Sequence, residues 1–396
     1  MAKKICMVTQ SYYPTDPRVR REAETASSAG WEVFVLSLRG EGGSRQQHLN
    51  GVSVQTLSLA KRRGGPWRYI FEYLCFFLWA SWTLALLQLR HGFGIIQVHT
   101  LPDFLVFSAI VPRLLGARVI LDLHEIMPEF FASKYRIPDH HPVIKLLLFI
   151  ERLSARFADA VITVNDPIKD QLASRGLPPS KITVVINSVD EELFDRADPD
   201  RPASGKKGLS LMYHGTLTDI YGLDIALRGL DIIRRAIPQV HLHIFGDGPE
   251  EEALRGLAGR LQLDEHITFH GRVPLERIPS HLADGDIGLL PTRQDRFLDL
   301  SFSNKLLEYI YMKKPVVCSR LFTTGVYFGE SSLAYFQPHD PADLASRVIS
   351  LYRDQEAGKA QVAAALRDYR KIRWPIMRER YLQLLRGLVS SGRSAG

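Results

Sequence analysis

The chain has 396 residues, of which 45% are hydrophobic and 23% are charged. This composition is typical of soluble globular proteins and excludes a disordered chain, a collagen-like fibre and a protein with many membrane spans. The length predicts two or three domains, each with enough apolar residues for its own core.

The net charge of +7 is unevenly distributed along the chain. Residues 1–189 contain 22 Lys and Arg against 15 Asp and Glu, whereas residues 190–396 contain 28 basic and 28 acidic residues. The excess positive charge therefore lies in the first half. It favours an anionic membrane surface, phosphorylated lipids or nucleic acid as a partner of that half.

The cysteines and the N-terminal residues indicate the cellular compartment of the protein. Cys6, Cys75 and Cys318 are far apart and fit no zinc or disulfide spacing, which favours a reducing cytosol. The opening sequence MAKKICMVTQSYYP has too short an apolar run for a signal peptide and predicts a first β-strand instead.

Short runs rich in Val and Ile alternate with helical patterns in the first half, as expected of buried parallel strands and their crossover helices. Strands are predicted at Ile5–Thr9, Glu32–Leu38, Ile95–His99, Val119–Leu123, Ala160–Val164 and Ile182–Ile186. Helices are predicted at Val19–Ala29, Trp67–Leu89, Asp103–Leu115, Ile144–Phe157 and Pro167–Arg175. This rhythm predicts a doubly wound sheet.

The same rhythm restarts after the segment DPDRPASGKKG, which reads as a linker. Strands are predicted at Ser210–His214, Val240–Phe245, Ile267–His270, Ile287–Pro291 and Val316–Ser319. Helices are predicted at Leu223–Ala236, Glu250–Leu261, Pro274–Ala283, Asn304–Met312 and Pro341–Arg353. A last helical pattern, Ala363–Leu388, contains Pro375, which should break or kink it.

The fold class is therefore α/β, with two Rossmann-like domains that face a central cleft. We expect a first domain over residues 1–197, a linker over 198–208, a second domain over 209–365, and a helix and tail over 366–396 that cross back to the first domain. Ligands of such sheets bind at the carboxyl ends of the strands, which makes the cleft the expected active site.

The segment Tyr69–Leu89 is the most apolar in the chain and is long enough to span a bilayer. Basic residues flank it, namely Lys61, Arg62, Arg63, Arg68 and Arg90. Spanning would place two parts of one sheet on opposite sides of a membrane. We therefore favour a helix that lies on an anionic membrane surface, with a spanning helix and an ordinary buried helix as alternatives.

The sequence around residues 301–309, SFSNKLLEY, is the sharpest signal in the second half. Ser303 and Asn304 stand at the start of a predicted helix, where backbone N–H groups attract phosphate, and Lys305 adds a charge beside them. Glu308 follows one turn later, where it can accept hydrogen bonds from a ribose. The alternative interpretation is an ordinary capped helix with a surface glutamate.

Two other loops follow predicted strands of the second half. Gly246 and Gly248 lie in a Gly-Asp-Gly-Pro turn and would let the backbone approach a ligand closely. Arg272 and Val273 follow the next strand, where the backbone could contact the edge of a nucleobase.

In the first half, His99 and His124 each end a predicted strand, which should bring both to the cleft. Asp103 and Glu125 follow them closely. The segment DPRVRRE opens the first helix, and the arginines in it suit a negatively charged substrate. The alternatives are structural histidines and a solvated, charged helix face.

At this point the chain resembles the family 4 retaining glycosyltransferases, which have the twin-Rossmann GT-B fold. The resemblance runs nearly end to end and rests on several segments together: DPRVRRE, GWEVFVL, VHTLPD, DLHEIMPE, HGTL, YGLD, GDGP, NKLLEY and KPVV. It implies sugar transfer from a nucleotide sugar with retention at the anomeric carbon. It also implies that the second domain holds the donor and the first domain the acceptor.

The resemblance assigns roles residue by residue. Glu308 matches the second glutamate of the family's Glu-x7-Glu motif, which contacts the donor ribose, and His124 matches the family histidine near the transferred sugar. These two are the expected catalytic residues. The expected donor-binding residues are Gly215, Thr216, Gly246, Gly248, Arg272, Val273, Arg293, Ser303, Asn304, Lys305 and Glu308. The expected acceptor-binding residues are Asp16, Arg18, Arg20, His99, Asp103 and Glu125.

The chain also departs from the family pattern. Leu300 stands at the first motif glutamate, with Asp299 as its neighbour, and the usual phosphate-binding Arg and Lys align near Thr216 and Tyr221. Arg293 or Lys305 would then have to neutralise the diphosphate. The segment Asp284-Gly-Asp286 has the form of a DxD metal motif, but its position is one that the family uses structurally, so no metal and no cofactor are expected.

The sequence thus predicts a retaining, metal-independent, hexosyltransferase-type enzyme. It would move a sugar from a UDP or GDP sugar to a lipid-linked or membrane-surface saccharide in polysaccharide or glycolipid biosynthesis. The expected location is the cytoplasm, peripherally on the inner face of the cell membrane, with no nucleic acid partner. Alternatives are a nucleotide-sugar epimerase or hydrolase and a non-catalytic nucleotide-sugar-binding protein. An NAD-dependent oxidoreductase is disfavoured because no glycine fingerprint follows the first strand.

Overall fold

A computed structural model describes residues 3–40, 42–59, 66–198 and 208–391. The chain forms two compact units, one of residues 1–187 with 375–396 and one of residues 188–374. The first unit ends earlier than the expected boundary at residue 197. The C-terminal segment belongs to the first unit, in agreement with the predicted return of the last helix. Residues 199–207 of the predicted linker lie outside the described residues.

The first unit is built on an eight-stranded sheet in the order β3-β4-β2-β1-β5-β6-β7-β8. All neighbours are parallel except the edge pair β3–β4. The strands are β1 (Lys4–Tyr12), β2 (Glu32–Leu38), β3 (Gln46–Leu49), β4 (Val52–Leu57), β5 (Ile95–His99), β6 (Arg118–Leu123), β7 (Ala160–Thr163) and β8 (Ile182–Val184). The central strands are buried on both sides, which explains their continuous apolar sequence.

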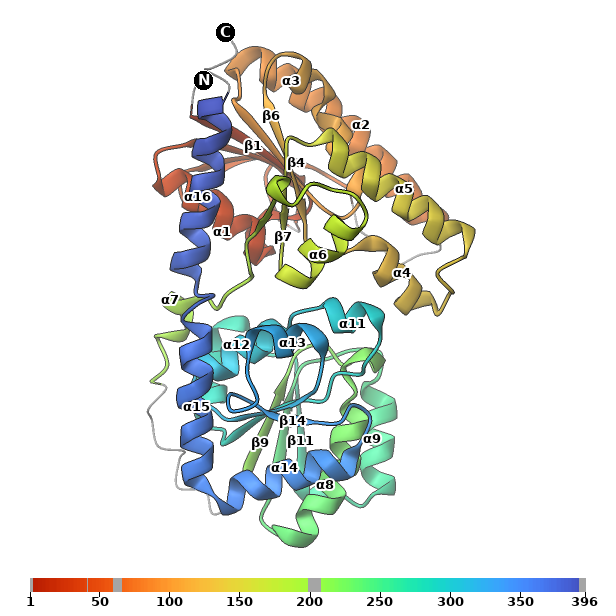
Figure 1. The fold of residues 1–396 in the computed structure, drawn as a ribbon, viewed down its shortest axis with the longest axis vertical. Coiled ribbons are helices and arrows are strands. Elements are labelled where there is room, and N and C mark those ends of the chain that lie inside the picture. Colours follow the sequence, from red (N-terminus) through yellow and green to blue (C-terminus); the bar gives the residue numbers. More distant parts are fainter. Residues whose placement is uncertain (1–2, 41, 60–65, 199–207, 392–396) are drawn as a thin grey trace. The chain divides into compact units, whose positions relative to one another are not determined.

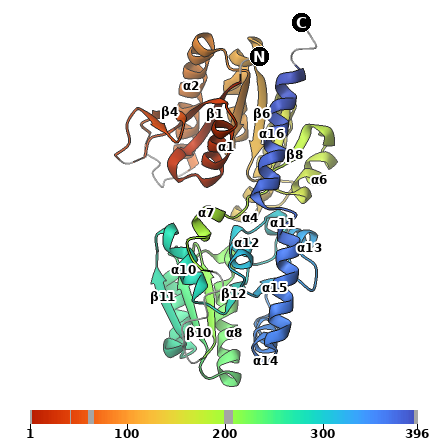
Figure 2. The ribbon, with the colours of Figure 1, turned by 90° about the vertical axis from the view of Figure 1, so that its left-hand side faces the viewer.

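Helices cover both faces of this sheet. They are α1 (Pro17–Ser28), α2 (Pro66–His91), α3 (Ile110–Leu114), α4 (Met127–Tyr135), α5 (Pro142–Phe157), α6 (Asp166–Ser174) and α16 (Trp374–Ser391). Figure 1 shows α2, α3 and α5 together on one face, and Figure 2 shows α16 on the side of α1. The helix predicted at Asp103–Leu115 is in fact a 3-10 helix, η2 (Asp103–Ala109), followed by the short α3.

Helix α2 packs through one side and exposes the other. Phe76, Ala80 and Leu84 are fully buried, whereas Leu78 and Trp82 are 65% and 70% exposed. Its segment Ile70–His91 has a mean hydropathy of 1.7 and is long and apolar enough to cross a membrane by length and composition. The helix is therefore only partly buried in the first unit, and its place at a membrane surface stays a prediction. The basic residues Lys61–Arg63, on which the surface interpretation partly depends, lie outside the described residues.

The second unit contains a parallel six-stranded sheet in the order β11-β10-β9-β12-β13-β14. Its strands are β9 (Ser210–His214), β10 (His241–Phe245), β11 (Ile267–Gly271), β12 (Ile287–Leu290), β13 (Val316–Ser319) and β14 (Ala334–Phe336). Leu and Ile side chains of β9, β10 and α8 form the centre of its core.

The helices of this unit are α7 (Glu191–Phe194), α8 (Leu223–Ala236), α9 (Glu251–Arg260), α10 (Ile278–Ala283), α11 (Arg296–Leu300), α12 (Asn304–Tyr311), α13 (Phe322–Tyr327), α14 (Pro341–Arg353) and α15 (Gln355–Tyr369). Helices α8 and α14 lie side by side (Figure 1). The chain leaves helical structure after Tyr369 and resumes at Trp374, so the predicted break near Pro375 is confirmed. The fold is thus the predicted pair of Rossmann-like domains.

Candidate active site

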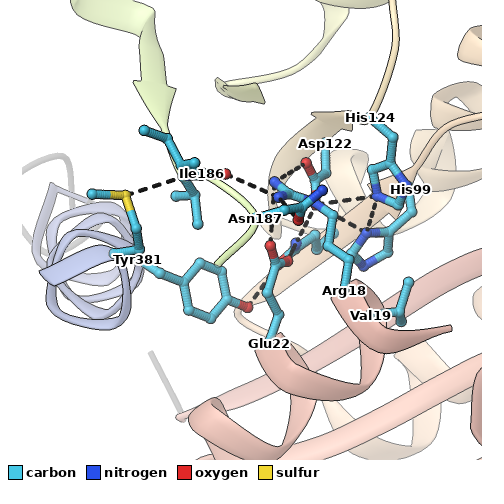
Figure 3. Close-up of polar contacts among 12 residues, drawn as sticks. Arg18, Val19, Glu22, His99, Asp122, His124, Ile186, Asn187 and Tyr381 are labelled. Atoms are coloured by element: carbon cyan, nitrogen blue, oxygen red, sulfur yellow. Dashed lines mark hydrogen bonds and ion pairs between the residues drawn. The ribbon is translucent and has the colours of Figure 1, made fainter. Parts of the chain in front are cut away.

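Two neighbouring strands of the first unit bring three of its titratable side chains together. His99 is the last residue of β5 and pairs in register with Asp122 near the end of β6, and His124 follows β6 directly. The Nδ1 atom of His99 lies 3.0 Å from Oδ2 of Asp122 and 3.2 Å from Nε2 of His124 (Figure 3). The structure therefore joins the two predicted histidines through a carboxylate that the sequence did not single out.

Arg18 of α1 neutralises this carboxylate. Its Nε and Nη2 donate to the two oxygens of Asp122 at 3.1 and 2.8 Å, and its Nη1 donates to Val185 O and to Asn187 Oδ1, both at 2.9 Å. Burial alone would raise the pKa of Asp122, but the Arg18 charge and the neighbouring histidines hold it well below its usual value. All three guanidinium nitrogens are engaged within the protein. Arg18 is therefore a positioning residue rather than the predicted acceptor-binding residue.

A chain of buried hydrogen bonds connects this cluster to the last helix, α16. Tyr381 of α16 donates to Gln97 Oε1 at 2.8 Å, and Gln97 Nε2 donates to Glu22 Oε2 at 2.5 Å. Figure 3 shows Tyr381 and Glu22 beside the cluster. Burial and the nearby negative charge of Asp122 raise the pKa of Glu22 to about 8. The sequence analysis missed Gln97, Glu22 and Tyr381, because nothing in the local pattern shows that they meet.

The other predicted acceptor residues are not gathered at this cluster. Asp16 caps α1 by accepting from Val19 N at 3.2 Å. Arg20 is 44% exposed and pairs with Glu24 at 3.8 Å. Asp103 is buried, and burial together with the charge of Glu151 raises its pKa to about 8. Asp103 therefore lies inside the first unit, and its predicted contact with an acceptor stays a prediction.

Glu125 follows His124 and is half-buried. Burial raises the pKa of its carboxyl, and the nearby His124 and Lys134 counteract part of this effect. Glu125 thus remains beside the cluster as a candidate acceptor contact.

Among the described residues, His99, Asp122 and His124 form the one group whose ligand atoms could meet a metal ion, since these atoms lie within 4.8 Å of one another. The positive charge of Arg18 is paired with the same carboxylate, and its repulsion disfavours the binding of a metal cation there. Asp286 of the DxD segment accepts from Ser210 N at 2.8 Å, which agrees with its predicted structural use.

In the second unit, Glu308 lies in α12 and points to the end of β9. Its Oε2 is 2.5 Å from Nε2 of His214, and His214 Nδ1 is 3.1 Å from the hydroxyl of Tyr309. That hydroxyl donates to Met212 O at 3.0 Å. Glu308 is thus held in place by a histidine at the carboxyl end of a strand, and its contact with a ribose stays a prediction.

Lys305 lies beside Glu308 at the start of the same helix. Its Nζ is 3.7 Å from the centre of the Tyr221 ring and 5.6 Å from that of Tyr213. Burial lowers the pKa of Lys305 to about 8, although Glu308 counteracts part of this effect. A Cβ at Gly215 would lie 2.1 Å from Cε of Lys305, so the glycine makes room for this side chain.

Arg293, the other predicted diphosphate cation, is paired within the protein. Its Nε lies 3.0 Å from Oδ1 of Asp219, and its Nη2 lies 2.8 Å from Oδ1 of Asp224. Two carboxylates offset its charge, which leaves Lys305 as the better candidate for binding a diphosphate. The ring of Tyr221 stabilises the ammonium group of Lys305 by a cation–π contact.

Both glycine positions of the Gly-Asp-Gly-Pro turn exclude a larger residue because of the neighbouring backbone. A Cβ at Gly246 would lie 1.9 Å from Gly215 O, and one at Gly248 would lie 2.3 Å from Leu217 O. Both glycines therefore allow a close approach between two backbone segments of the protein, and their predicted contact with a ligand stays a prediction.

The remaining predicted donor residues lie at the carboxyl ends of the strands or at the start of α12. Thr216 follows β9 and is exposed, as is Arg272, while Val273 is half-buried. Ser303 is the N-cap of α12 without a side-chain capping bond, and Asn304 is the first residue of that helix. Asp299, the neighbour of Leu300, accepts from Phe322 N at 3.1 Å at the start of α13 and so links α11 to α13.

Comparisons with known proteins find a matching protein family for each of the two units. A family model for "Glycosyl transferase 4-like domain" matches residues 15–188, and one for "Glycosyl transferases group 1" matches residues 208–354. The GDP-mannose-dependent alpha-(1-6)-phosphatidylinositol monomannoside mannosyltransferase of Mycolicibacterium smegmatis is 30% identical over 34% of this chain and 37% of its own. The chitobiosyldiphosphodolichol beta-mannosyltransferase of Candida glabrata is 22% identical over 90% of this chain and 85% of its own. The chain spans about a third of the length of the first of these relatives.

Solved structures share the fold over nearly the whole chain. Sucrose-phosphate synthase of Thermosynechococcus elongatus matches with a TM-score of 0.76 and 17% identity over 98% of this chain and 99% of its own. HepE of Anabaena in complex with UDP matches with a TM-score of 0.72 and 16% identity over 97% and 100%. Because the two family models together cover most of the residues, the chain belongs to the family 4 glycosyltransferases with the GT-B fold.

Proposed function

We propose that the chain transfers a sugar from a UDP or GDP sugar to a lipid-linked or membrane-surface saccharide, with retention at the anomeric carbon and without a metal. The proposed binding of a nucleotide-sugar donor rests on the position of Lys305. A largely desolvated ammonium group stands at the start of α12 beside Glu308, in a family in which the usual cations are replaced here by Thr216 and Tyr221. A nucleoside diphosphate would add negative charge beside an ammonium group whose desolvation Glu308 offsets only in part.

The names of relatives support this choice of substrates. The mycobacterial relative is named for GDP-mannose and a phosphatidylinositol mannoside, and HepE was solved with UDP and with UDP-glucose. The relatives' names include both alpha and beta transfer, so retention in this chain rests on its resemblance to the retaining members.

A panel of nucleotide sugars tests the donor assignment by thermal shift. A specific donor should stabilise the protein by about 2.7 kcal/mol when present at about 100 times its dissociation constant. Lys305→Met should weaken this donor roughly tenfold or more, since a charge-assisted contact to phosphate is lost. Lys359→Met, at an exposed lysine of α15, is the matched control and should bind as the wild type does.

The same panel gives a pH dependence. Because the pKa of Lys305 is about 8, the free protein must take up a proton to bind a diphosphate at higher pH. Donor affinity should therefore fall as the pH rises from 7 to 9 and should not fall in Lys305→Met. With an active donor, EDTA should leave turnover unchanged, and NMR should show the donor's anomeric configuration in the product. Equal donor affinity in Lys305→Met and in the control would contradict the assignment.

We infer the membrane half of the proposal from an exposed apolar surface on α2, α3 and α5. The side chains that define it are Phe71, Leu78, Trp82, Leu89, Leu114, Leu146 and Phe149, all more than half exposed. These three helices lie on one face of the sheet (Figure 1), and the excess positive charge of the chain lies in the same half. Apolar side chains together with basic residues are the combination that binds anionic membrane interfaces.

The double variant Leu78→Ser/Trp82→Ser should bind anionic vesicles far more weakly than the wild type. The loss should be roughly tenfold for each side chain, since burial of one large apolar side chain contributes about 1.5 kcal/mol or more. Vesicle sedimentation measures the binding, which should also weaken as salt screens the charges.

The matched control for the vesicle experiment is Leu275→Ser/Phe322→Ser, which removes two apolar side chains of the second unit that are also more than half exposed. It should bind vesicles as the wild type does. Equal losses in both double variants, or no binding by the wild type, would remove this surface as the docking site. Resistance to alkaline carbonate would instead indicate a spanning helix.

A further inference from the structure

The position of one proton decides what His124 can do. The Nδ1 atom of His99 lies between two acceptors, Oδ2 of Asp122 at 3.0 Å and Nε2 of His124 at 3.2 Å (Figure 3). His124 Nε2 is also 3.5 Å from the same Asp122 oxygen, which is too far for a good hydrogen bond. The short contact between the two rings therefore needs a hydrogen on one of the two facing nitrogens.

Two observations place that hydrogen on His99. An unprotonated Nδ1 would turn its lone pair toward the carboxylate of Asp122, which Arg18 keeps ionised, and the two would repel. The other ring nitrogen of His99, Nε2, is buried without a hydrogen-bond partner. A hydrogen on that atom would be a buried donor with nothing to receive it, which is costly.

We propose that His99 is a positioning residue that holds His124 in the Nδ1–H tautomer. With Nδ1–H of His99 donating to it, Nε2 of His124 is an acceptor, so a neutral His124 carries its hydrogen on Nδ1. The backbone of His124 is fixed as well, because its N–H donates to Thr100 Oγ1 at 3.1 Å. Ring orientation and tautomer are thus both set from within the protein.

This arrangement narrows the role of His124 in the proposed function, on which the inference rests. The side chain is 21% exposed, and no partner for Nδ1 is found in the described part of the chain. His124 then offers an N–H to an oxygen of the bound sugar or acceptor. It does not serve as a general base, since its basic nitrogen already accepts from His99.

A bound cation is the competing arrangement, and it makes a different prediction. It would need unprotonated His99 Nδ1 and His124 Nε2, which moves the hydrogen of His99 to the buried Nε2 atom. The tautomer of His99 therefore separates the two arrangements, even though His124 has the same tautomer in both.

Ring ¹⁵N signals of the full chain test the proposal without any activity assay. Long-range ¹H–¹⁵N correlation separates protonated from unprotonated ring nitrogens, and His124→Gln and His99→Asn identify the two rings by the loss of their signals. We expect hydrogen on Nδ1 of both His99 and His124 at neutral pH. Hydrogen on Nε2 of either ring would overturn the proposal.

Two substitutions of His99 provide a matched pair. In His99→Asn the side-chain amide places N–H donors where Nδ1 stood, so it can serve both Asp122 and His124 Nε2. In His99→Leu no donor remains, and His124 should lose its single tautomer. With the donor found in the thermal-shift panel, kcat should fall roughly tenfold or more in His99→Leu with little change in KM for the donor. It should recover most of the wild-type value in His99→Asn.

Tyr381→Phe is the control for a merely structural role. It removes a buried hydrogen bond to Gln97 at the other side of Asp122 and leaves His124 untouched. Its melting temperature should fall, while the tautomer of His124 and kcat stay as in the wild type. A value of kcat in His99→Leu equal to that of Tyr381→Phe would overturn the proposal. The ring signals decide the tautomer of His124 even if no nucleotide sugar is turned over. A failure of the proposed glycosyl transfer can therefore be told apart from a failure of the proposed tautomer.

Discussion

Replacement of Glu308 by alanine should weaken nucleotide-sugar binding and lower turnover by at least roughly tenfold, the scale of one charge-assisted hydrogen bond. Glu308 lies in the first turns of α12, and His214 holds its carboxylate at 2.5 Å. Because one oxygen is thus oriented by the protein, the carboxylate is prepared to receive the hydroxyls of a ribose. Steady-state kinetics and donor titration of the purified variant measure both effects.

The control for this variant is Glu356→Ala, which removes an exposed carboxylate of α15 that pairs with the exposed Lys359 at 2.8 Å. It should bind and turn over donor as the wild type does. A loss of melting temperature in Glu308→Ala without any change in donor affinity or turnover would make the Glu308–His214 pair purely structural and would remove the assignment.

Replacement of Arg18 by leucine should have the largest effect on stability. Asp122 is fully buried, and Arg18 makes hydrogen bonds to both of its oxygens. Removal of one partner of a buried ion pair leaves an uncompensated charge and typically costs about 3–5 kcal/mol. In a unit of this size the melting temperature should fall by on the order of 10 °C. Thermal and urea unfolding measure the loss.

The exposed Arg20 on the same helix is the matched control, since its pair with Glu24 is 3.8 Å apart and both side chains are partly solvated. Arg20→Leu should change stability by only about 0.5 kcal/mol. An equally small change in Arg18→Leu would contradict the assigned role of Arg18.

The deficit of Arg18→Leu should depend on pH with a definite sign. In the wild type the folded pKa of Asp122 is depressed, so its stabilisation is present above the unfolded pKa and is lost toward low pH. Without Arg18, burial raises the folded pKa instead, and the variant loses stability as the pH rises through it. The deficit should therefore shrink on acidification, and Arg18→Leu/Asp122→Leu should recover part of it at neutral pH.

The sequence by itself determined the layered architecture and the place of the two histidines and of Glu308. Parallel strands buried on both sides must be apolar at nearly every position, so they stand out as short Val and Ile runs between longer helical patterns. His99, His124 and the start of α12 then fall at strand ends and a helix end by simple counting. Pro375 marked a helix break because proline cannot continue the backbone hydrogen bonds of a helix.

The edge hairpin β3–β4 was missed although a local signal for it exists. Asn50 and Gly51 both have positive φ, at 49° and 78°, and Asn-Gly is the preferred turn of a two-residue hairpin. Only β4 alternates apolar and polar residues, while β3 is short and polar, so the periodicity around the turn is weak. The short strand β14 escaped for a similar reason, since it has only three residues.

Only the tertiary structure decided which charged groups are free to bind a substrate. Arg18 and Arg293 look alike in the sequence as basic residues near expected ligand sites, and both prove to be paired with carboxylates of the protein. Arg18 and its partner Asp122 are 104 residues apart in the chain, so no local pattern links them. The charge that a side chain can offer depends on the neighbours and the desolvation that packing imposes, and these are set by contacts between elements distant in the sequence.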